Sequence, residues 1–147
     1  MNSLALLNAE ITMTSLEVVD LINKFREEEG NRAVLKHYDF MKSIRKELES
    51  LANAGVEVAE RNISVGSYVD KQNQQRPCYK MSRSWVMQMC NKESALVRYK
   101  TQQYIEALEQ ALSDLRFRQG DKIINEVVLW KFGKTLRVMR NYIKLAI

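Results

Sequence analysis

Residues 63–81 read ISVGSYVDKQNQQRPCYKM, and this stretch predicts a β-hairpin. Apolar and polar residues alternate over 63–69 and again over 78–81, which is the period-two pattern of half-buried strands. The polar run at 70–75 lies between them and predicts a hairpin with a long, exposed tip. Pro77 fits an edge position or the first residue of the return strand, because proline has no N–H to donate to a neighbouring strand.

A short strand and a helix are expected before this hairpin. Residues 4–7 form a short apolar run of the length of a small strand. Thr14 and Glu17 have the spacing of a capping box, in which each side chain satisfies a free amide at the start of a helix. Apolar residues recur behind them at helical spacing, so we expect a helix over 15–28 that stops at Gly30.

A second helix is expected over residues 38–53, and it has two different faces. Its apolar stripe consists of Met41, Ile44, Leu48 and Leu51. Its opposite face carries Lys42, Arg45, Lys46 and Glu49. After the hairpin we expect a third helix capped by Ser82, a fourth over about 94–118, and a last amphipathic helix over about 122–145.

The charge of the chain is unevenly distributed. The 147 residues carry a formal net charge of +5. Residues 1–30 hold 2 basic and 6 acidic groups, whereas residues 61–100 hold 8 basic and 2 acidic groups. A basic patch of this kind fits either an anionic partner or a solvated face.

Residue types that perform catalysis or bind metals are sparse. His37 is the only histidine, and Cys78 and Cys90 lack the partners that a zinc site needs. The five glycines are scattered and form no phosphate-binding loop. No apolar run is long enough to cross a bilayer. We therefore expect no enzyme, no cofactor, no metal site and no membrane segment, in an intracellular protein with free thiols and a buried Cys90.

The order of the expected elements is that of a winged helix-turn-helix domain, an α+β fold. We expect this domain over residues 1–93, and a helical extension over 94–147 that packs on it or on a second subunit. In such a fold the second helix enters the major groove of DNA and the hairpin touches the backbone or minor groove. The candidate nucleic-acid-binding residues are Arg32, Lys36, His37, Lys42, Arg45, Lys46, Lys71 and Arg76. At the entry to the second helix, His37 is expected to contact phosphate, to cap the helix, or to be a satisfied structural histidine.

Several short motifs occur in a specific order along the chain. They are MTSLEVV at 13–19, EGNR at 29–32, LKH at 35–37, IR at 44–45, SYVD at 67–70, QRPCY at 75–79, MSR at 81–83, NKE at 91–93 and YIE at 104–106. Together they resemble the family of phage regulatory proteins called Rha, over about residues 4–109. The resemblance implies a phage or prophage origin, and with it the cytoplasm of a bacterial host. It also implies a winged-helix-like amino-terminal domain and a regulatory role often grouped with antirepressors.

Two functions stay open at this point. The first is a regulator that binds double-stranded DNA through the winged helix. The second is a phage factor that binds a protein with the same scaffold, either as an antirepressor or as an inhibitor of a host defence or replication protein, such as an anti-CRISPR.

The last expected helix has a basic face with a candidate partner-binding role, formed by Lys134, Arg137, Arg140 and Lys144. Because its apolar stripe must be buried, we expect a homodimer formed through the C-terminal helices. Such a dimer would present two reading heads to a pseudo-palindromic site.

Overall fold

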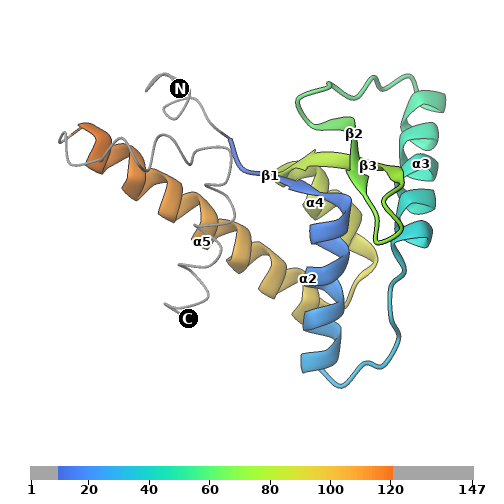
Figure 1. Cartoon of the computed structure of the whole chain (residues 1–147), viewed down its shortest axis with the longest axis horizontal. Helices are drawn as coiled ribbons and strands as arrows, with labels where there is room; N and C mark the ends of the chain where they lie inside the picture. Colours follow the sequence, from blue (N-terminus) through green and yellow to red (C-terminus); the bar gives the residue numbers. More distant parts are fainter. Residues whose placement is uncertain (1–9, 121–147) are drawn as a thin grey trace. The chain divides into compact units, whose positions relative to one another are not determined.

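The computed structural model describes residues 10–120 (Figure 1). Of these, residues 12–102 form one compact unit, and residues 10, 11 and 103–120 belong to a second. The elements in chain order are β1 (Thr12–Thr14), α2 (Ser15–Glu28), α3 (His37–Asn53), β2 (Ile63–Val69), β3 (Gln75–Ser82), α4 (Arg83–Met89), the 3-10 turn η1 (Cys90–Lys92) and α5 (Ala95–Gly120). The class is mixed α+β, as the sequence predicts. The strand expected at 4–7 and the helix expected at 122–145 lie outside the described residues.

The start of α2 confirms the predicted capping box. Thr14 Oγ1 accepts a hydrogen bond from Glu17 N–H at 3.3 Å, and Thr14 N–H donates to Glu17 Oε2 at 2.9 Å. These bonds satisfy amides that no carbonyl of the helix can reach. Beyond the C-cap Glu29, Gly30 has a φ of +80°, a backbone conformation that favours glycine. The helix therefore stops where the glycine predicts.

The helix α3 has the two faces expected from its sequence. Phe40, Met41 and Ile44 are buried on one side. Lys42, Arg45 and Lys46 are exposed on the other. α2 contacts α3, β1 and β3. The basic face of α3 is therefore left to solvent.

The sheet is antiparallel with strand order β1-β3-β2, so β3 is its central strand. β2 and β3 form the predicted hairpin, with a register that runs from Ile63 opposite Met81 to Val69 opposite Gln75. β1 pairs with Lys80–Ser82 only. Pro77 therefore lies in a central strand, but in a part of it that β1 does not reach. The strand β1 was not expected, because three residues are too few for an alternating pattern.

The remaining helices begin close to their predicted positions. Ser82 Oγ accepts a hydrogen bond from Trp85 N–H at 3.4 Å and so caps α4, which contacts β1 and β3. Ser94 Oγ accepts from Val97 N–H at 3.2 Å at the start of α5. The buried core of residues 12–102 includes Val18, Ile22, Ile44, Met81, Val86 and Val97.

Candidate nucleic-acid interface

The exposed stripe of α3 is a continuous basic surface. Lys42, Arg45 and Lys46 lie within little more than one helical turn, so they share one side of the helix. Asp39 and Glu49 are exposed on the same helix and limit the patch at its two ends. The patch can neutralise phosphates or donate hydrogen bonds to base edges.

Tyr38 belongs to this stripe, although the sequence did not single it out. Its side chain is 67% exposed, and Lys42 Nζ lies 5.7 Å from the centroid of its ring. The spacing of four residues between the two was the signal that could have found it, since such residues are neighbours on a helix. An exposed aromatic ring beside lysines offers apolar contact to a base in addition to charge.

The segment between α2 and α3 is held in a defined conformation. Asn23 makes two hydrogen bonds to Leu35: its Nδ2 donates to the carbonyl at 2.9 Å, and its Oδ1 accepts from the N–H at 2.8 Å. Arg26 Nη1 donates to the carbonyl of Ala33 at 3.1 Å. These bonds fix the path of the chain up to Lys36, which is exposed as the N-cap of α3 and makes no capping bond with its side chain.

Arg32 has a different setting from the other candidate residues. It lines an open hollow of about 770 Å³ between α2 and the following segment, together with Lys24 and the acids Asp20 and Glu27. These lining charges are mixed. We therefore give Arg32 less weight as a phosphate contact than the basic residues of α3.

Two of the three consecutive acids at the end of α2 are engaged by the start of α5. Glu28 forms an ion pair with Lys100, which lowers the pKa of the glutamate. Glu29 accepts hydrogen bonds from Ser94 Oγ–H at 3.0 and 2.8 Å. Glu27 is the member of the run that lines the hollow. Two of the three carboxylates in this run are thus bound by groups at the start of α5.

The hairpin tip forms a hydrogen-bonded cluster around Asp70. Asp70 Oδ1 accepts from the N–H groups of Gln72 and Gln74, both at 2.9 Å. Its Oδ2 pairs with Arg76 Nε at 2.9 Å, and this guanidinium, followed by the Gln74 amide, lowers the pKa of the carboxyl. Arg76 is therefore engaged within the tip. Lys71 is exposed and takes no part in these bonds, so it is the better candidate for contact with an anion.

His37 lies at the point where α3 meets the hairpin. Its Nε2 is 2.9 Å from Ser15 Oγ, and its ring meets the ring of Tyr68 edge-on, with 5.7 Å between the centroids. Burial lowers the pKa of His37, and the field of Asp20 opposes this shift only in part. The predicted capping role is wrong, because the N-cap of α3 is Lys36 and no side chain caps it.

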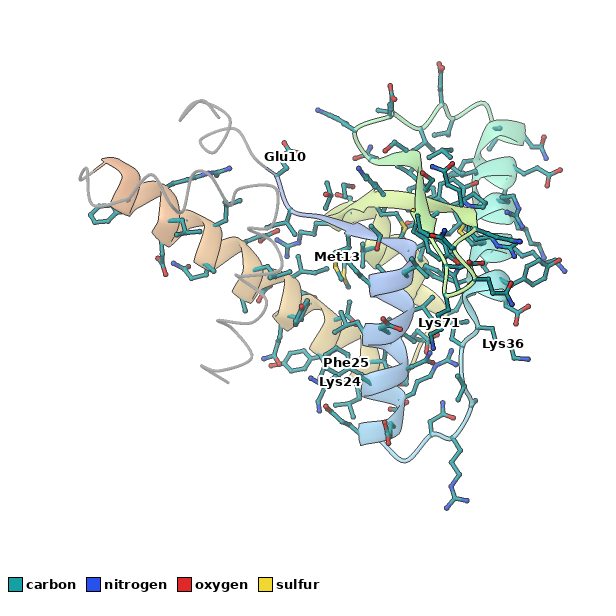
Figure 2. All side chains as sticks on the ribbon, viewed as in Figure 1. Glu10, Met13, Lys24, Phe25, Lys36 and Lys71 are labelled. Atoms are coloured by element: carbon teal, nitrogen blue, oxygen red, sulfur yellow. The ribbon has the colours of Figure 1, made fainter. Side chains whose placement is uncertain are left out.

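The contact between His37 and Tyr68 brings two candidate surfaces to the same region. Tyr68 pairs with Arg76 next to the hairpin tip, and His37 is the first residue of α3. The first turn of α3 therefore lies beside the end of the hairpin that carries the tip. Figure 2 shows Lys36 at the start of α3 and Lys71 on that tip.

The remaining chemistry of the described residues is sparse. Cys78 and Cys90 are buried as free thiols, and burial raises the pKa of both, that of Cys90 to about 11. Residues 10–120 contain no group of three or more side chains able to hold a metal ion. Within that same range, every helix is too short or too polar to cross a bilayer. The predicted partner-binding residues Lys134, Arg137, Arg140 and Lys144 lie outside it.

Comparison with known proteins found no significant match for this chain. No protein-family model matches the chain, and no curated protein or solved structure matches it significantly.

Proposed function

We propose that this protein is a phage or prophage regulator that binds double-stranded DNA through a winged helix. In this assignment α3 enters the major groove and the β2–β3 hairpin is the wing. The order β1-α2-α3-β2-β3 and the sheet order β1-β3-β2 support it. The resemblance of the sequence motifs to the Rha family supports the regulatory role. No catalytic group enters the proposal.

The observation that carries the proposal is the position of the basic stripe on α3. Lys42, Arg45 and Lys46 are exposed on the helix whose first turn contacts the hairpin through His37 and Tyr68. A helix and a hairpin tip at one end of a small unit form a surface that suits a groove and its flanking phosphates. The lysines and arginine supply charge, and Tyr38 supplies an apolar contact.

Binding of duplex DNA as a function of salt tests the proposal directly. We expect micromolar protein to bind a labelled duplex at about 50 mM salt, with a negative slope of log affinity against log salt. Lys42→Ala and Arg45→Ala should each weaken binding and reduce the magnitude of the slope by about 1. Lys92→Ala is the matched control, because it removes the same charge from an exposed position in η1.

A protein partner is the second candidate function. Val34 is 73% exposed on the segment that Asn23 and Arg26 hold in place, and it borders the hollow beside α2. An exposed apolar side chain on a fixed loop is suited to contact with a protein. Absence of any DNA binding at low salt would favour this candidate, as an antirepressor or an inhibitor of a host protein.

A further inference from the structure

One buried hydroxyl connects four elements of the unit that contains the candidate interface. Ser15, the first residue of α2, is fully buried. Its Oγ accepts a hydrogen bond from Tyr79 N–H of β3 at 3.1 Å and lies 2.9 Å from His37 Nε2 of α3. The histidine ring in turn packs edge-on against Tyr68 of β2. The hydrogen bonds of this serine thus link the first turn of α3 to the sheet.

The hydrogen bonds of Ser15 bear on the protonation state of His37. The Tyr79 amide can only donate, so Ser15 Oγ accepts from it. The hydroxyl proton then needs an acceptor, and the histidine Nε2 is the acceptor at hydrogen-bond distance. An imidazole accepts at Nε2 only when it is neutral, with its proton on Nδ1. This arrangement favours a neutral His37 with its proton on Nδ1.

Protonation of the ring would turn His37 Nε2 from an acceptor into a donor at this bond. With Nε2 carrying a proton, Ser15 Oγ would have to accept from both Tyr79 and His37, and its own proton would have to find another buried acceptor. An unsatisfied buried polar group is strongly unfavourable. The contact between α3 and the sheet is therefore weaker when His37 is charged.

The groups around the ring agree with this assignment. From α2 come the Ser15 hydroxyl and the carboxylate of Asp20, from β2 the phenol of Tyr68, and from β3 the amide of Tyr79. Asp20 favours the charged ring, but burial disfavours it more, so the pKa of His37 is lowered. The neutral form therefore prevails at neutral pH.

We propose that Ser15 and His37 are positioning residues that hold α3 in its DNA-reading orientation only while His37 is neutral, so that acid weakens DNA binding. This inference rests on the proposed function. It predicts the opposite sign from a histidine that contacts phosphate, because protonation of such a residue strengthens binding to an anion. The sign of the pH dependence therefore separates the two roles.

The decisive measurement is DNA affinity from about pH 7.5 to about pH 5.5 at constant ionic strength. We expect the wild-type affinity to fall over this range by at most about tenfold, because pH 5.5 lies about one unit below the ordinary histidine pKa of 6.5. His37→Gln is the conservative rescue, since its amide oxygen can accept from Ser15 at any pH. This variant should bind nearly as well as the wild type at the upper pH and should show a flat profile. Affinity in the wild type that is constant or rises with acid would overturn the inference, as would a fall that persists in His37→Gln.

A second readout is independent of DNA. In an NMR titration, the amides of residues 37–41 should shift together with the His37 ring in the wild type, and the same amides should not titrate over that range in His37→Gln. If the amides titrate but no DNA binds, the proposed function is wrong, while the pH-dependent positioning of α3 by Ser15 and His37 is supported. If DNA binds and the amides do not follow the ring, the positioning role is wrong and the proposed function survives.

Discussion

The two ends of α2 are attached to the rest of the unit by different kinds of contact. At the amino-terminal end, Ser15 is joined to His37 and to the Tyr79 amide by hydrogen bonds between neutral groups. This end holds α3 and the hairpin, which carry the candidate interface. Contacts of this kind depend on the protonation of one ring and respond little to salt.

At the carboxy-terminal end the contacts are charged. Arg26 pairs with Glu93 through two hydrogen bonds, of which Nε–Oε2 measures 2.9 Å, and both side chains are largely buried at 16% and 11% exposure. Glu28 pairs with Lys100 nearer the surface. This end holds η1 and the start of α5. One helix thus holds α3 and the hairpin by neutral hydrogen bonds at one end, and η1 and the start of α5 by charged contacts at the other.

The largest expected effect is at the charged end. Arg26→Ala removes the partner of a buried carboxylate and a bond to the Ala33 carbonyl, so we expect the free energy of unfolding to fall by about 3 kcal/mol. Urea denaturation measures this loss. A double-mutant cycle with Glu93→Ala is the control: the double variant should lose clearly less than the two single losses combined. Additive losses would show that the pair is not coupled.

Ser15→Ala tests the neutral end. It leaves the Tyr79 N–H and His37 Nε2 without their partner, so we expect a loss of about 2 kcal/mol in the free energy of unfolding. Ser84→Ala makes the same chemical change at an exposed position of α4 and should stay within about 0.5 kcal/mol of the wild type. If both variants unfold alike, the Ser15 hydroxyl does not stabilise the junction.

The two ends of α2 should also respond differently to pH. The pKa of His37 lies below its ordinary value of 6.5 in the folded chain, so the unfolded chain binds more protons there and stability falls as the pH drops below 6.5. The carboxyls of Glu28 and Asp70, whose pKa values are lowered, lose their contribution only below their ordinary values of 4.5 and 3.8. Urea midpoints between about pH 7 and pH 5 therefore isolate the single histidine. The slope in this window should disappear in His37→Gln, and a slope that remains would assign it elsewhere.

The smallest expected effect is at the surface of the charged end. Glu28→Gln removes the carboxylate that pairs with Lys100, and solvent already screens this exposed pair. We expect no measurable change in the urea midpoint at about 150 mM salt, and a slight loss at low salt where screening is weaker. A loss comparable to that of Arg26→Ala would mean that the two contacts act as one network.

The sequence predicted the local structure well, because its signals are local. Thr14 and Glu17 are three residues apart, and the hairpin strands are separated only by their turn, so spacing alone locates them. The basic face of α3 followed from the same kind of pattern. The position of Pro77 was less clear, because the extent of β1 decides which part of β3 behaves as an edge.

The contacts that organise the site were beyond such patterns. His37 and Ser15 are separated by 22 residues, and Arg26 and Glu93 by 67, so no periodicity relates them. Only the packing of α2 on α3 and the sheet brings them together. The sequence placed His37 at the entry to the helix, but its partner Ser15 and the burial that lowers its pKa follow from the fold.

The burial of both native thiols has a practical consequence for spectroscopy. Cys78 and Cys90 are 2% and 0% exposed, and burial disfavours the reactive thiolate of each. Thiol-directed dyes should therefore react slowly with the two native cysteines, so that background labelling of the wild-type chain is low. A cysteine introduced at Gln72 would be exposed on the hairpin tip, where the tip's bonds use the backbone N–H of that residue and not its side chain. A fluorophore at this one position would let the approach of a duplex to the tip be followed without first removing the native cysteines.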